Sequence, residues 1–248
     1  MCVRGDRRQR IDVPPRYLSP VTTTSAAQPR THAPRAFWQR TAVRHLKRAD
    51  PVLAGIIERV GPSRFARPTT GSHLDALVRS IVSQQLSTSA AATIHSRLIA
   101  LVGVPDPLPH HWLALNDPDL RAAGLSRQKI AYIRDLARHV QDGALPMAKL
   151  HEMDDDAVIE ALTEVKGIGV WTAQMFLMFR LARPDILPVL DLGIRNAIRR
   201  AYRLRKEPTA KRMHALAKPW APYRSVASWY LWQSLELPPL ESATSNGR

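Results

Sequence analysis

Two glycines and one aspartate form the pattern in this sequence that most clearly predicts chemistry. Gly167 and Gly169 lie in the segment Val-Lys-Gly-Ile-Gly-Val-Trp-Thr-Ala (165–173), at the start of a helix expected over about 170–181. Glycine relieves the steric limit on the backbone, and the outward N–H groups of such a turn and helix N-terminus suit a phosphate. Asp191 follows a proline break and begins the next expected helix. A phosphate socket and a single carboxylate, joined by one helix, indicate chemistry on a nucleic acid.

The charge balance supports a polyanionic partner. The chain has 36 Lys and Arg residues against 21 Asp and Glu, which gives a formal net charge of +15 and a pI near 10.9. Charge of this size supplies the sequence-independent part of nucleic-acid affinity. A ribosome-associated protein or a membrane-surface binder would show the same balance, so charge alone does not separate these classes. At 248 residues, 45% of them hydrophobic, the chain is long enough for one large or two small domains.

Residue counts exclude several other classes. The single cysteine, Cys2, rules out a disulfide framework and any four-cysteine zinc or iron–sulfur site. The nine histidines show no His-x-x-x-His spacing beside an acid, so we expect them at the surface or in the core rather than on a metal. No apolar run approaches the roughly 18 residues that span a bilayer, and the N-terminus lacks the apolar stretch of a secretory signal. We therefore expect a soluble, cytoplasmic protein.

Three regions are expected along the chain. Residues 1–35 hold five prolines and scattered arginines, which predicts a disordered basic arm that either adds DNA affinity or is dispensable. A helical domain is expected over 36–238 and a flexible tail over 239–248. Helices are expected at 37–48, 51–60, 74–85, 87–101, 117–123, 126–142, 155–164, 170–181, 191–202, 209–217 and 222–235.

Helix-end signals support these assignments. Asp50 before Pro51 combines an N-cap with proline at the first helical position, and Ser87 and Asp155 are expected as similar caps. Three glycines fall at expected helix ends: Gly124, Gly143 and Gly167. Apolar residues repeat every three or four positions from 125 to 140, which is typical of a buried helix face. The sequence therefore predicts an all-α protein of ten or eleven short helices.

Four blocks, in this order, resemble the helix–hairpin–helix superfamily of DNA glycosylases. They are Ser-Ile-Val-Ser-Gln-Gln-Leu-Ser (80–87), Leu-Arg-Ala-Ala-Gly-Leu-Ser (120–126), the hairpin with its trailing Pro-x-x-Asp (155–191) and the tryptophan-rich segment 220–232. The subgroup that they resemble is the alkylbase glycosylases, relatives of 3-methyladenine DNA glycosylase II. The resemblance covers about residues 40–236 and implies a compact all-α fold with two helical lobes and the active-site cleft between them.

The resemblance assigns Asp191 as the catalytic carboxylate. A negative charge there would stabilise the sugar as it becomes oxocarbenium-like, or would orient the attacking water. A base alkylated on a ring nitrogen is already cationic and leaves without a general acid, so one acid suffices. From the residues alone, Asp191 is also a good N-cap for the helix that follows, and both roles can coexist.

The base pocket that the resemblance implies contains Trp171, Trp232 and Met175. Aromatic faces stack well on an electron-poor cationic purine. Core packing of the last helix is the alternative for Trp232. In relatives that also cut the DNA strand, the position of Trp171 is a lysine that forms a Schiff base, which an indole cannot do. A monofunctional enzyme that leaves an abasic site is therefore expected.

The resemblance also implies the residues that grip DNA. Gln84 and Gln85 lie at a helix end, with Gln85 at the wedge that fills the space left by a flipped nucleotide; an exposed helix-terminal glutamine is the alternative. The hairpin would contribute Lys166, Gly167, Gly169 and Thr172 as further DNA contacts. No cofactor is required, although relatives place a sodium or potassium ion against hairpin carbonyls, which here would belong to Thr163, Val165 and Ile168.

Taken together, the sequence predicts a base-excision-repair glycosylase. It would flip 3-methyladenine- or 7-methylguanine-type purines out of damaged double-stranded DNA and hydrolyse the N-glycosidic bond. It is expected to be a monomer with no membrane partner, associated with a bacterial nucleoid. One alternative is the same fold acting on hypoxanthine, ethenoadenine or uracil. The other is a non-catalytic DNA-binding protein that keeps the hairpin for docking.

Overall fold

Every regular element that the structure describes is a helix, as the sequence predicts. The structure is a computed structural model that describes residues 35–65 and 70–238. The arm expected over 1–35, apart from Arg35 at the start of the first helix, and the tail expected over 239–248 lie outside the described residues. Within the described ranges, none of the helices has the length and apolar character needed to cross a lipid bilayer.

The described residues form twelve α-helices. Their bounds are α1 (Arg35–Ala49), α2 (Pro51–Val60), α3 (His73–Ser83), α4 (Thr88–Val102), α5 (Pro109–Ala114), α6 (Asp117–Ala122), α7 (Arg127–Gln141), α8 (Asp155–Thr163), α9 (Val170–Met175), α10 (Leu192–Ala201), α11 (Ala210–Ala217) and α12 (Arg224–Leu235). Short turns η1 (Met147–Lys149) and η3 (Lys218–Trp220) are 3₁₀, and η2 (Phe176–Arg180) is π-helical.

The expected helices are confirmed, with ends that differ by one or two residues. The expected helix over 170–181 is α9 continued by η2, where the Leu181 N–H reaches back five residues to the Phe176 carbonyl. The short helix α5 was missed, although it begins with proline at its first position. Asp155 is not a cap, contrary to expectation: Asp154 holds that position, and Asp155 pairs instead with Arg183.

Cap chemistry explains several of the boundaries. The Asp50 carboxylate accepts the N–H groups of Val52 and Leu53 at the start of α2, and Ser87 accepts that of Ala90 in α4. The glycines expected at helix ends, Gly124, Gly143 and Gly167, all have positive φ. The apolar stripe of α7 is also confirmed, since its central residues, among them Ile133 and Leu136, are fully buried.

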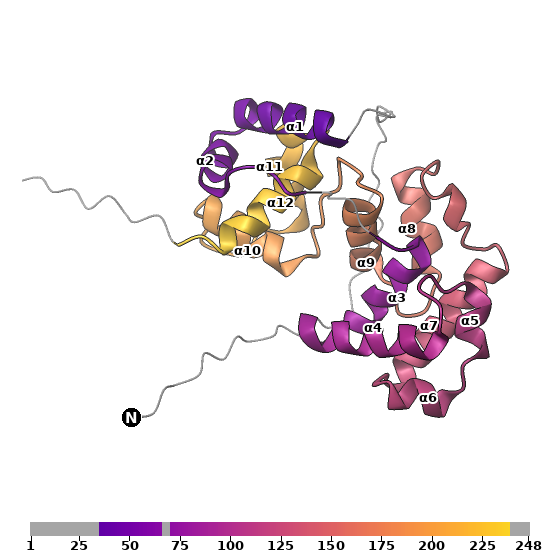
Figure 1. The fold of residues 1–248 in the computed structure, drawn as a ribbon. Helices are drawn as coiled ribbons and strands as arrows, with labels where there is room; N and C mark the ends of the chain where they lie inside the picture. Colours follow the sequence, from indigo (N-terminus) through magenta and orange to yellow (C-terminus); the bar gives the residue numbers. More distant parts are fainter. Residues whose placement is uncertain (1–34, 66–69, 239–248) are drawn as a thin grey trace, which may run out of the picture.

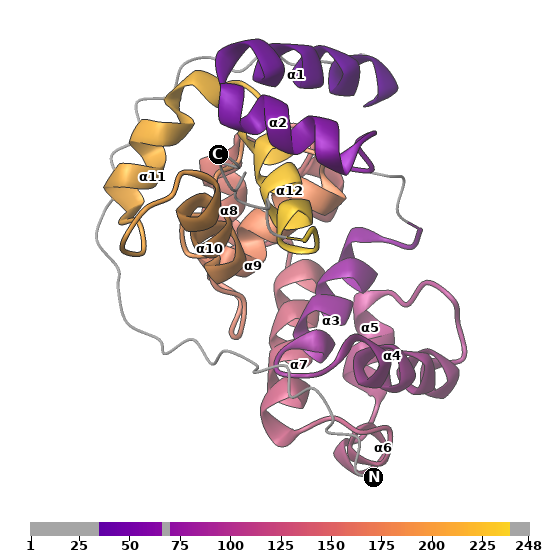
Figure 2. The ribbon, with the colours of Figure 1, turned by 90° about the vertical axis from the view of Figure 1, so that its left-hand side faces the viewer.

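The helices form two lobes, visible in Figures 1 and 2. In one lobe α1 and α2 from the start of the described chain pack with α10 and α12 from its end. The other lobe contains α3 to α7, with α3 against both α4 and α7. Helix α9 lies between the lobes in Figure 1, and its continuation η2 packs against α3. The chain thus crosses from the second lobe back to the first through the hairpin helix.

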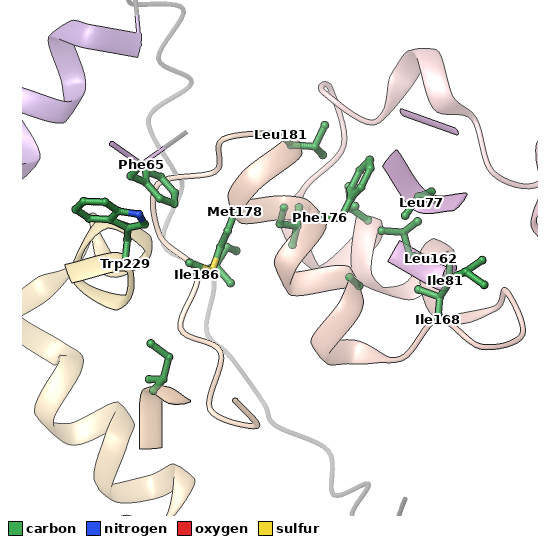
Figure 3. Packing of buried hydrophobic residues seen from close by; sticks show 14 of the residues in the cluster. Phe65, Leu77, Ile81, Leu162, Ile168, Phe176, Met178, Leu181, Ile186 and Trp229 are labelled. Carbon is green, nitrogen blue, oxygen red and sulfur yellow. The ribbon is translucent and has the colours of Figure 1, made fainter. Parts of the chain in front are cut away.

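Buried side chains extend through both lobes (Figure 3). Phe65 and Trp229 pack in the first lobe, and Leu77 and Ile81 of α3 in the second. The buried side chain of Met178, in η2, lies between these groups. This packing holds η2, the continuation of the hairpin helix, between the two lobes.

Candidate active site

Asp191 stands at the first turn of α10, at the end of the connection from η2. Its Oδ1 accepts the Ile194 N–H at 2.7 Å, so the N-cap role expected from the sequence is confirmed. Its own N–H donates to the Pro188 carbonyl at 3.0 Å, which closes the turn after the proline. The residue is only 8% exposed. A buried carboxylate needs hydrogen-bond donors around it, because an unpaired buried charge is costly.

Two tryptophans supply those donors. The Trp171 indole Nε1 donates to Asp191 Oδ2 at 2.8 Å, and the Trp232 Nε1 donates to Oδ1 at 2.8 Å. With the Ile194 amide, the carboxylate therefore accepts three N–H bonds from three elements: α9, α10 and α12. Donors alone suit the ionised form, which only accepts hydrogen bonds. The two tryptophans expected in the base pocket thus both contact the expected catalytic carboxylate.

The two indoles differ in exposure. Trp171 is 44% exposed, an unusual value for so large an apolar ring, whereas Trp232 is half-buried. Trp232 stacks on Phe179, with ring centroids 5.7 Å apart and an angle of 21° between planes. Met175 is half-buried and lies four residues after Trp171, on the same face of the hairpin helix. Trp232 thus packs on Phe179, as the core-packing alternative expects, and also contacts Asp191.

Gly193 lets the second indole approach, a feature that the sequence analysis missed. A Cβ on Gly193 would lie 2.8 Å from Trp232 Nε1 and 3.0 Å from Asp191 Oδ1. Any larger residue would push the indole or the carboxylate away, because real Cβ contacts are not that short. The sequence did offer one indication of this feature. Gly193 lies two residues after Asp191, in the first turn of a helix, where glycine is unfavourable and the local conformation does not require it.

A second pair of missed residues anchors the segment before Asp191. Arg224, at the start of α12, forms two hydrogen bonds of 2.7 Å to the Asp185 carboxylate. The hydrogen bond to Asp185 raises the pKa of Arg224, against the opposing effect of burial. Next to it, Ser225 donates its N–H to the Pro184 carbonyl and accepts the Ile186 N–H. The connection that carries Asp191 is therefore fastened to the helix that carries Trp232.

The hairpin has the geometry that the two-glycine pattern indicates. Gly167 has φ +85°, and a Cβ there would overlap the ring of Tyr132 at 2.2 Å. Gly169 is the N-cap of α9 and brings no side chain to it, which leaves the first-turn amides open to an outside acceptor. The Lys166 side chain is 75% exposed, with its Nζ 3.7 Å from Asp135 Oδ1, and the backbone N–H of Lys166 donates to Asp135 Oδ2 at 2.8 Å.

The Thr172 side chain is buried and not available to contact DNA. The residue is 5% exposed, because the helix turns that face into the core beside Ala173. The group of Thr172 that could bind a phosphate is its backbone N–H, in the first turn of α9. At the expected cation site, the Val165 carbonyl accepts the Ile168 N–H at 3.0 Å. A carbonyl has two lone pairs, so this bond is compatible with a cation on the same oxygen.

Gln84 and Gln85 follow directly after α3, and their side chains have different surroundings. Gln84 is half-buried and donates from Nε2 to the Gly167 carbonyl at 2.8 Å, which ties the end of α3 to the hairpin. Gln85 is exposed and has φ +58°, in the left-handed region that non-glycine residues rarely adopt. Of the two glutamines, Gln85 is therefore the more exposed.

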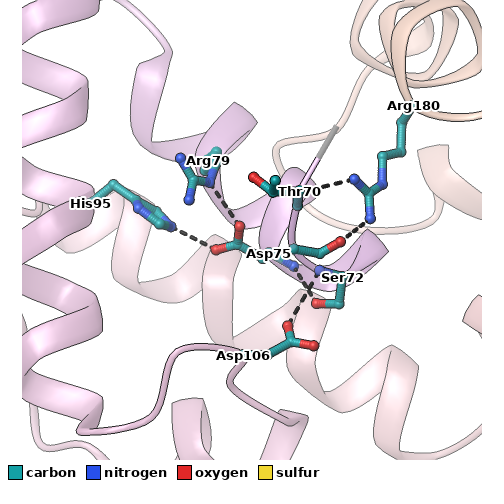
Figure 4. Close-up of polar contacts among 8 residues, drawn as sticks. Thr70, Ser72, Asp75, Arg79, His95, Asp106 and Arg180 are labelled. Carbon is teal, nitrogen blue, oxygen red and sulfur yellow. Dashed lines mark hydrogen bonds and ion pairs between the residues drawn. The ribbon is translucent and has the colours of Figure 1, made fainter. Parts of the chain in front are cut away.

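A polar cluster fastens the far end of the hairpin helix to α3 (Figure 4). Arg180 of η2 donates to the carbonyls of Thr70 and Gly71, just before α3, and to Nδ1 of His73. Inside α3, the Asp75 carboxylate bonds to His95 Nε2 and to Arg79 Nε, at 2.7 Å each. Over the described residues, no group of three His, Cys, Asp or Glu side chains is arranged to hold a metal ion.

Comparison with known proteins agrees with this geometry. Residues 78–222 match the family described as HhH-GPD superfamily base excision DNA repair protein. DNA-3-methyladenine glycosylase 1 of Schizosaccharomyces pombe is 34% identical over 78% of this chain and 86% of its own length. The Bacillus subtilis protein YfjP is 36% identical over 65% of this chain, and the match spans 58% of that longer protein.

Solved structures show the same fold. A DNA-3-methyladenine glycosidase from Bacillus halodurans has a TM-score of 0.71 at 39% identity, over 78% of this chain and 88% of the other. The S. pombe enzyme Mag1, solved in complex with abasic DNA, has a TM-score of 0.70 at 31% identity, over 82% of this chain and 100% of the other. Both the family match and these relatives span the hairpin and Asp191, and this chain belongs to the HhH-GPD superfamily of base excision DNA repair proteins.

Proposed function

We propose that this protein is a monofunctional DNA glycosylase that removes alkylated purines, such as 3-methyladenine and 7-methylguanine, from duplex DNA by hydrolysing the N-glycosidic bond. The observation that carries the proposal is the Asp191 carboxylate, buried and held by two indole N–H groups one helix away from the two-glycine hairpin. The relatives named as DNA-3-methyladenine glycosylases support the same activity and substrate class.

The chemistry follows from the charge of the reacting atoms. An N-alkylated purine is cationic, so it departs as a neutral base without a proton donor, and positive charge moves to the sugar. A fixed carboxylate stabilises that charge most where water is excluded and no reorganisation is needed. The indoles that hold Asp191 also bring flat aromatic surface to the site, and the exposed ring of Trp171 suits stacking on the flipped cationic base. Water then adds to the sugar and leaves an abasic site.

Trp171 also determines the outcome after base removal. Strand cleavage by the lyase route needs an amine that forms a Schiff base with the opened sugar, and an indole nitrogen has no such nucleophilicity. We expect no borohydride-dependent covalent trapping of the protein on abasic DNA. Trapping at the level of a known lyase, run in parallel, would contradict the monofunctional assignment.

The DNA grip that we propose combines backbone and wedge contacts. The amides at the start of α9 and the exposed Lys166 would hold a phosphate of the lesion strand, with a monovalent cation on the hairpin carbonyls as a further positive charge. Gln85 would fill the space left by the flipped base and hydrogen-bond the orphaned partner. The net charge of +15 suits binding to chromosomal DNA. We expect the protein to act as a monomer, in the compartment that contains that DNA.

The deciding experiment measures bases released from methylated duplex DNA by the protein and by Asp191→Asn. Asparagine caps a helix about as well as aspartate, so α10 should stay capped, while the variant loses the charge and the acceptor for one indole N–H. We expect release of 3-methyladenine to fall by roughly 100-fold or more. Asp156→Asn, at an exposed acid in the first turn of α8, is the matched control and should act like the unsubstituted protein.

Two other results would change the proposal. If no methylated base is released but a duplex containing an abasic-site analogue is still preferred over intact duplex, the substrate is another lesion, such as hypoxanthine, ethenoadenine or uracil. If the protein shows no preference for damaged duplex at all, it is a DNA-docking protein without catalysis.

A further inference from the structure

Lys129 reaches from one helix to the end of another. It lies in the first turn of α7, and its Nζ donates to the carbonyls of Val82 and Gln84 at 2.7 Å each. Both carbonyls belong to the C-terminal end of α3, where a helix leaves acceptors without partners in its own turns. A cation at this end also complements the negative pole of the helix dipole. Lys129 therefore caps the C-terminal end of α3, although it lies more than 40 residues further along the chain.

The local position of Lys129 gives no reason for a lysine. A cation in the first turn of a helix opposes the positive pole of its own helix, and the first turn of α7 contains no acid to offset it. Burial also lowers the pKa of the Lys129 ammonium, which is a cost to the charged form. A residue that is unfavourable for its own helix, and partly desolvated, is best explained by the contact that it makes across to α3.

That contact fixes the backbone that leads into Gln85. The carbonyl of Gln84 is part of the peptide group that precedes Gln85, so the ammonium of Lys129 holds the plane from which φ of Gln85 is measured. Gln85 has φ +58°, a conformation that costs free energy in any residue with a Cβ and persists only where neighbours enforce it. Lys129 supplies such enforcement at the residue where the chain turns outward.

The same turn is tied to the hairpin from the other side. The Gln84 side chain donates to the Gly167 carbonyl, so one residue carries both ties, its carbonyl to Lys129 and its amide to Gly167. A polar hollow of about 220 Å³ lies at this point and is lined by Gln85, Lys129 and Gly167, among others. The end of α3, the start of α7 and the hairpin therefore meet at one place on the surface.

We propose that Lys129 is a positioning residue that sets the Gln85 wedge in its left-handed conformation before DNA arrives, and that, through Gln84, it keeps the wedge at a fixed position relative to the hairpin. The inference rests on the proposed function, in which Gln85 enters the space left by a flipped nucleotide. A wedge that already has its bound conformation does not lose conformational entropy on binding. The full free energy of its contacts therefore contributes to the affinity for lesion DNA.

The first test compares Lys129→Met with Lys149→Met, which removes one positive charge at an exposed position in η1. The measurement is the affinity for a duplex with a tetrahydrofuran abasic-site analogue, for the intact duplex and for the single strand. Neither lysine is placed on a phosphate, so both variants should bind intact duplex nearly as the unsubstituted protein does. Only Lys129→Met should lose preference for the abasic duplex, by about tenfold, which corresponds to ~1.4 kcal/mol.

A double-variant cycle separates positioning from a general structural effect. If Lys129 acts through the wedge, then Lys129→Met added to Gln85→Ala should cause no further loss of lesion preference, since the wedge is already removed. A loss of lesion preference in the double variant equal to the sum of the two single losses would overturn the proposal. Thermal unfolding of each variant, measured in parallel, shows whether any variant is unfolded.

Gln84→Met keeps the proposal testable if Lys129→Met does not fold. Methionine has a similar length but cannot donate to the Gly167 carbonyl, so this variant should lose part of the preference for abasic duplex over intact duplex. Full retention by Gln84→Met would overturn the coupling to the hairpin. If the wild-type protein itself shows no preference for abasic duplex, the proposed function is overturned. If the wild type shows a clear preference and Lys129→Met shows the same preference, only the role of Lys129 is overturned.

Discussion

The indole N–H of Trp171 lies 2.8 Å from Oδ2 of Asp191, so the residue that excludes Schiff-base chemistry also orients the catalytic carboxylate that we propose. The ring is 44% exposed although its nitrogen is engaged. One side chain can thus hold the acid with its edge and offer a face to a flipped base. Orientation and stacking can be separated experimentally, because they use different parts of the ring.

Trp171→Phe should retain most of the stacking surface and lose the hydrogen bond. A hydrogen bond to a charged group contributes about 1.5–3 kcal/mol, so we expect kcat for release of 3-methyladenine to fall by about 10- to 100-fold. Affinity for the abasic-analogue duplex should change little. Trp171→Ala should reduce both quantities. Equal kcat for Trp171→Phe and the unsubstituted protein would show that the bond to Asp191 is not used in catalysis.

Gly193→Ala should reduce activity without reducing stability by much. The added Cβ would come within 3.0 Å of the carboxylate and closer still to the Trp232 nitrogen, so one of them must move. Misplacement of a catalytic group by about 1 Å costs roughly 100-fold in rate, so the variant should release 3-methyladenine about 10 to 100 times more slowly at saturating substrate.

Gly55→Ala is the matched control for that substitution. Gly55 is also helical, and a Cβ there meets nothing within 4 Å. Alanine in a helix interior is favoured over glycine by about 0.5–1 kcal/mol, so this variant should unfold at a slightly higher temperature with an unchanged rate of base release. A comparable loss of activity in both variants would mean that the close approach at Gly193 is not the cause.

Gly167→Ala should weaken both the fold and the DNA grip. Alanine at φ +85° is strained, and its Cβ would overlap the Tyr132 ring. Gly143→Ala carries the conformational cost alone, because Gly143 has φ +77° and open space around it. We expect Gly143→Ala to destabilise by about 1–2 kcal/mol with normal DNA affinity. Gly167→Ala should be less stable than that and should bind abasic-analogue duplex more weakly; identical behaviour of the two variants in unfolding and binding would contradict the prediction.

The parts of the fold that the sequence predicted correctly are those set by local chemistry. The cap at Asp50 and the positive φ of Gly124 and Gly143 depend on residues within a few positions of each other. Helix periodicity is local in the same sense. The short helix α5 was missed because six residues are too few to show a period, and its proline start was the only signal.

The contacts that position the site join residues far apart in the chain, so no local pattern marks them. Asp185 and Arg224 are 39 residues apart, and Gln84 and Gly167 are 83 apart. Each pair meets only because helix packing brings two elements together. The resemblance brought Asp191, Trp171 and Trp232 to one site, but it gave neither the hydrogen bonds from the two indoles to the carboxylate nor the burial of the Thr172 side chain.

Stability should fall on acidification through His73, which packs where η2 meets α3. Burial, then the Arg180 cation and then His151 lower the pKa of His73 to about 4. Its Nδ1 accepts the Arg180 Nε–H at 2.9 Å, which requires the neutral ring. An unfolded histidine titrates near 6.5, so between pH 6.5 and 4 the unfolded chain binds more protons than the folded protein. The contribution of neutral His73 is therefore complete above pH 6.5 and is lost as the pH falls towards 4.

The midpoint of thermal unfolding, followed from about pH 7.5 to 4, checks this. Asp75 adds little over most of that window: burial acts to raise its pKa, but the hydrogen bonds from His95 and Arg79 outweigh it, so its contribution is lost only as the pH falls into and below the ordinary titration range of aspartate. His73→Gln keeps an acceptor for Arg180 and cannot be protonated, so its midpoint should fall less steeply with acidification. His110→Gln, at an exposed histidine, should follow the unsubstituted protein. If His73→Gln shows the unsubstituted slope, another group is responsible for the acid sensitivity.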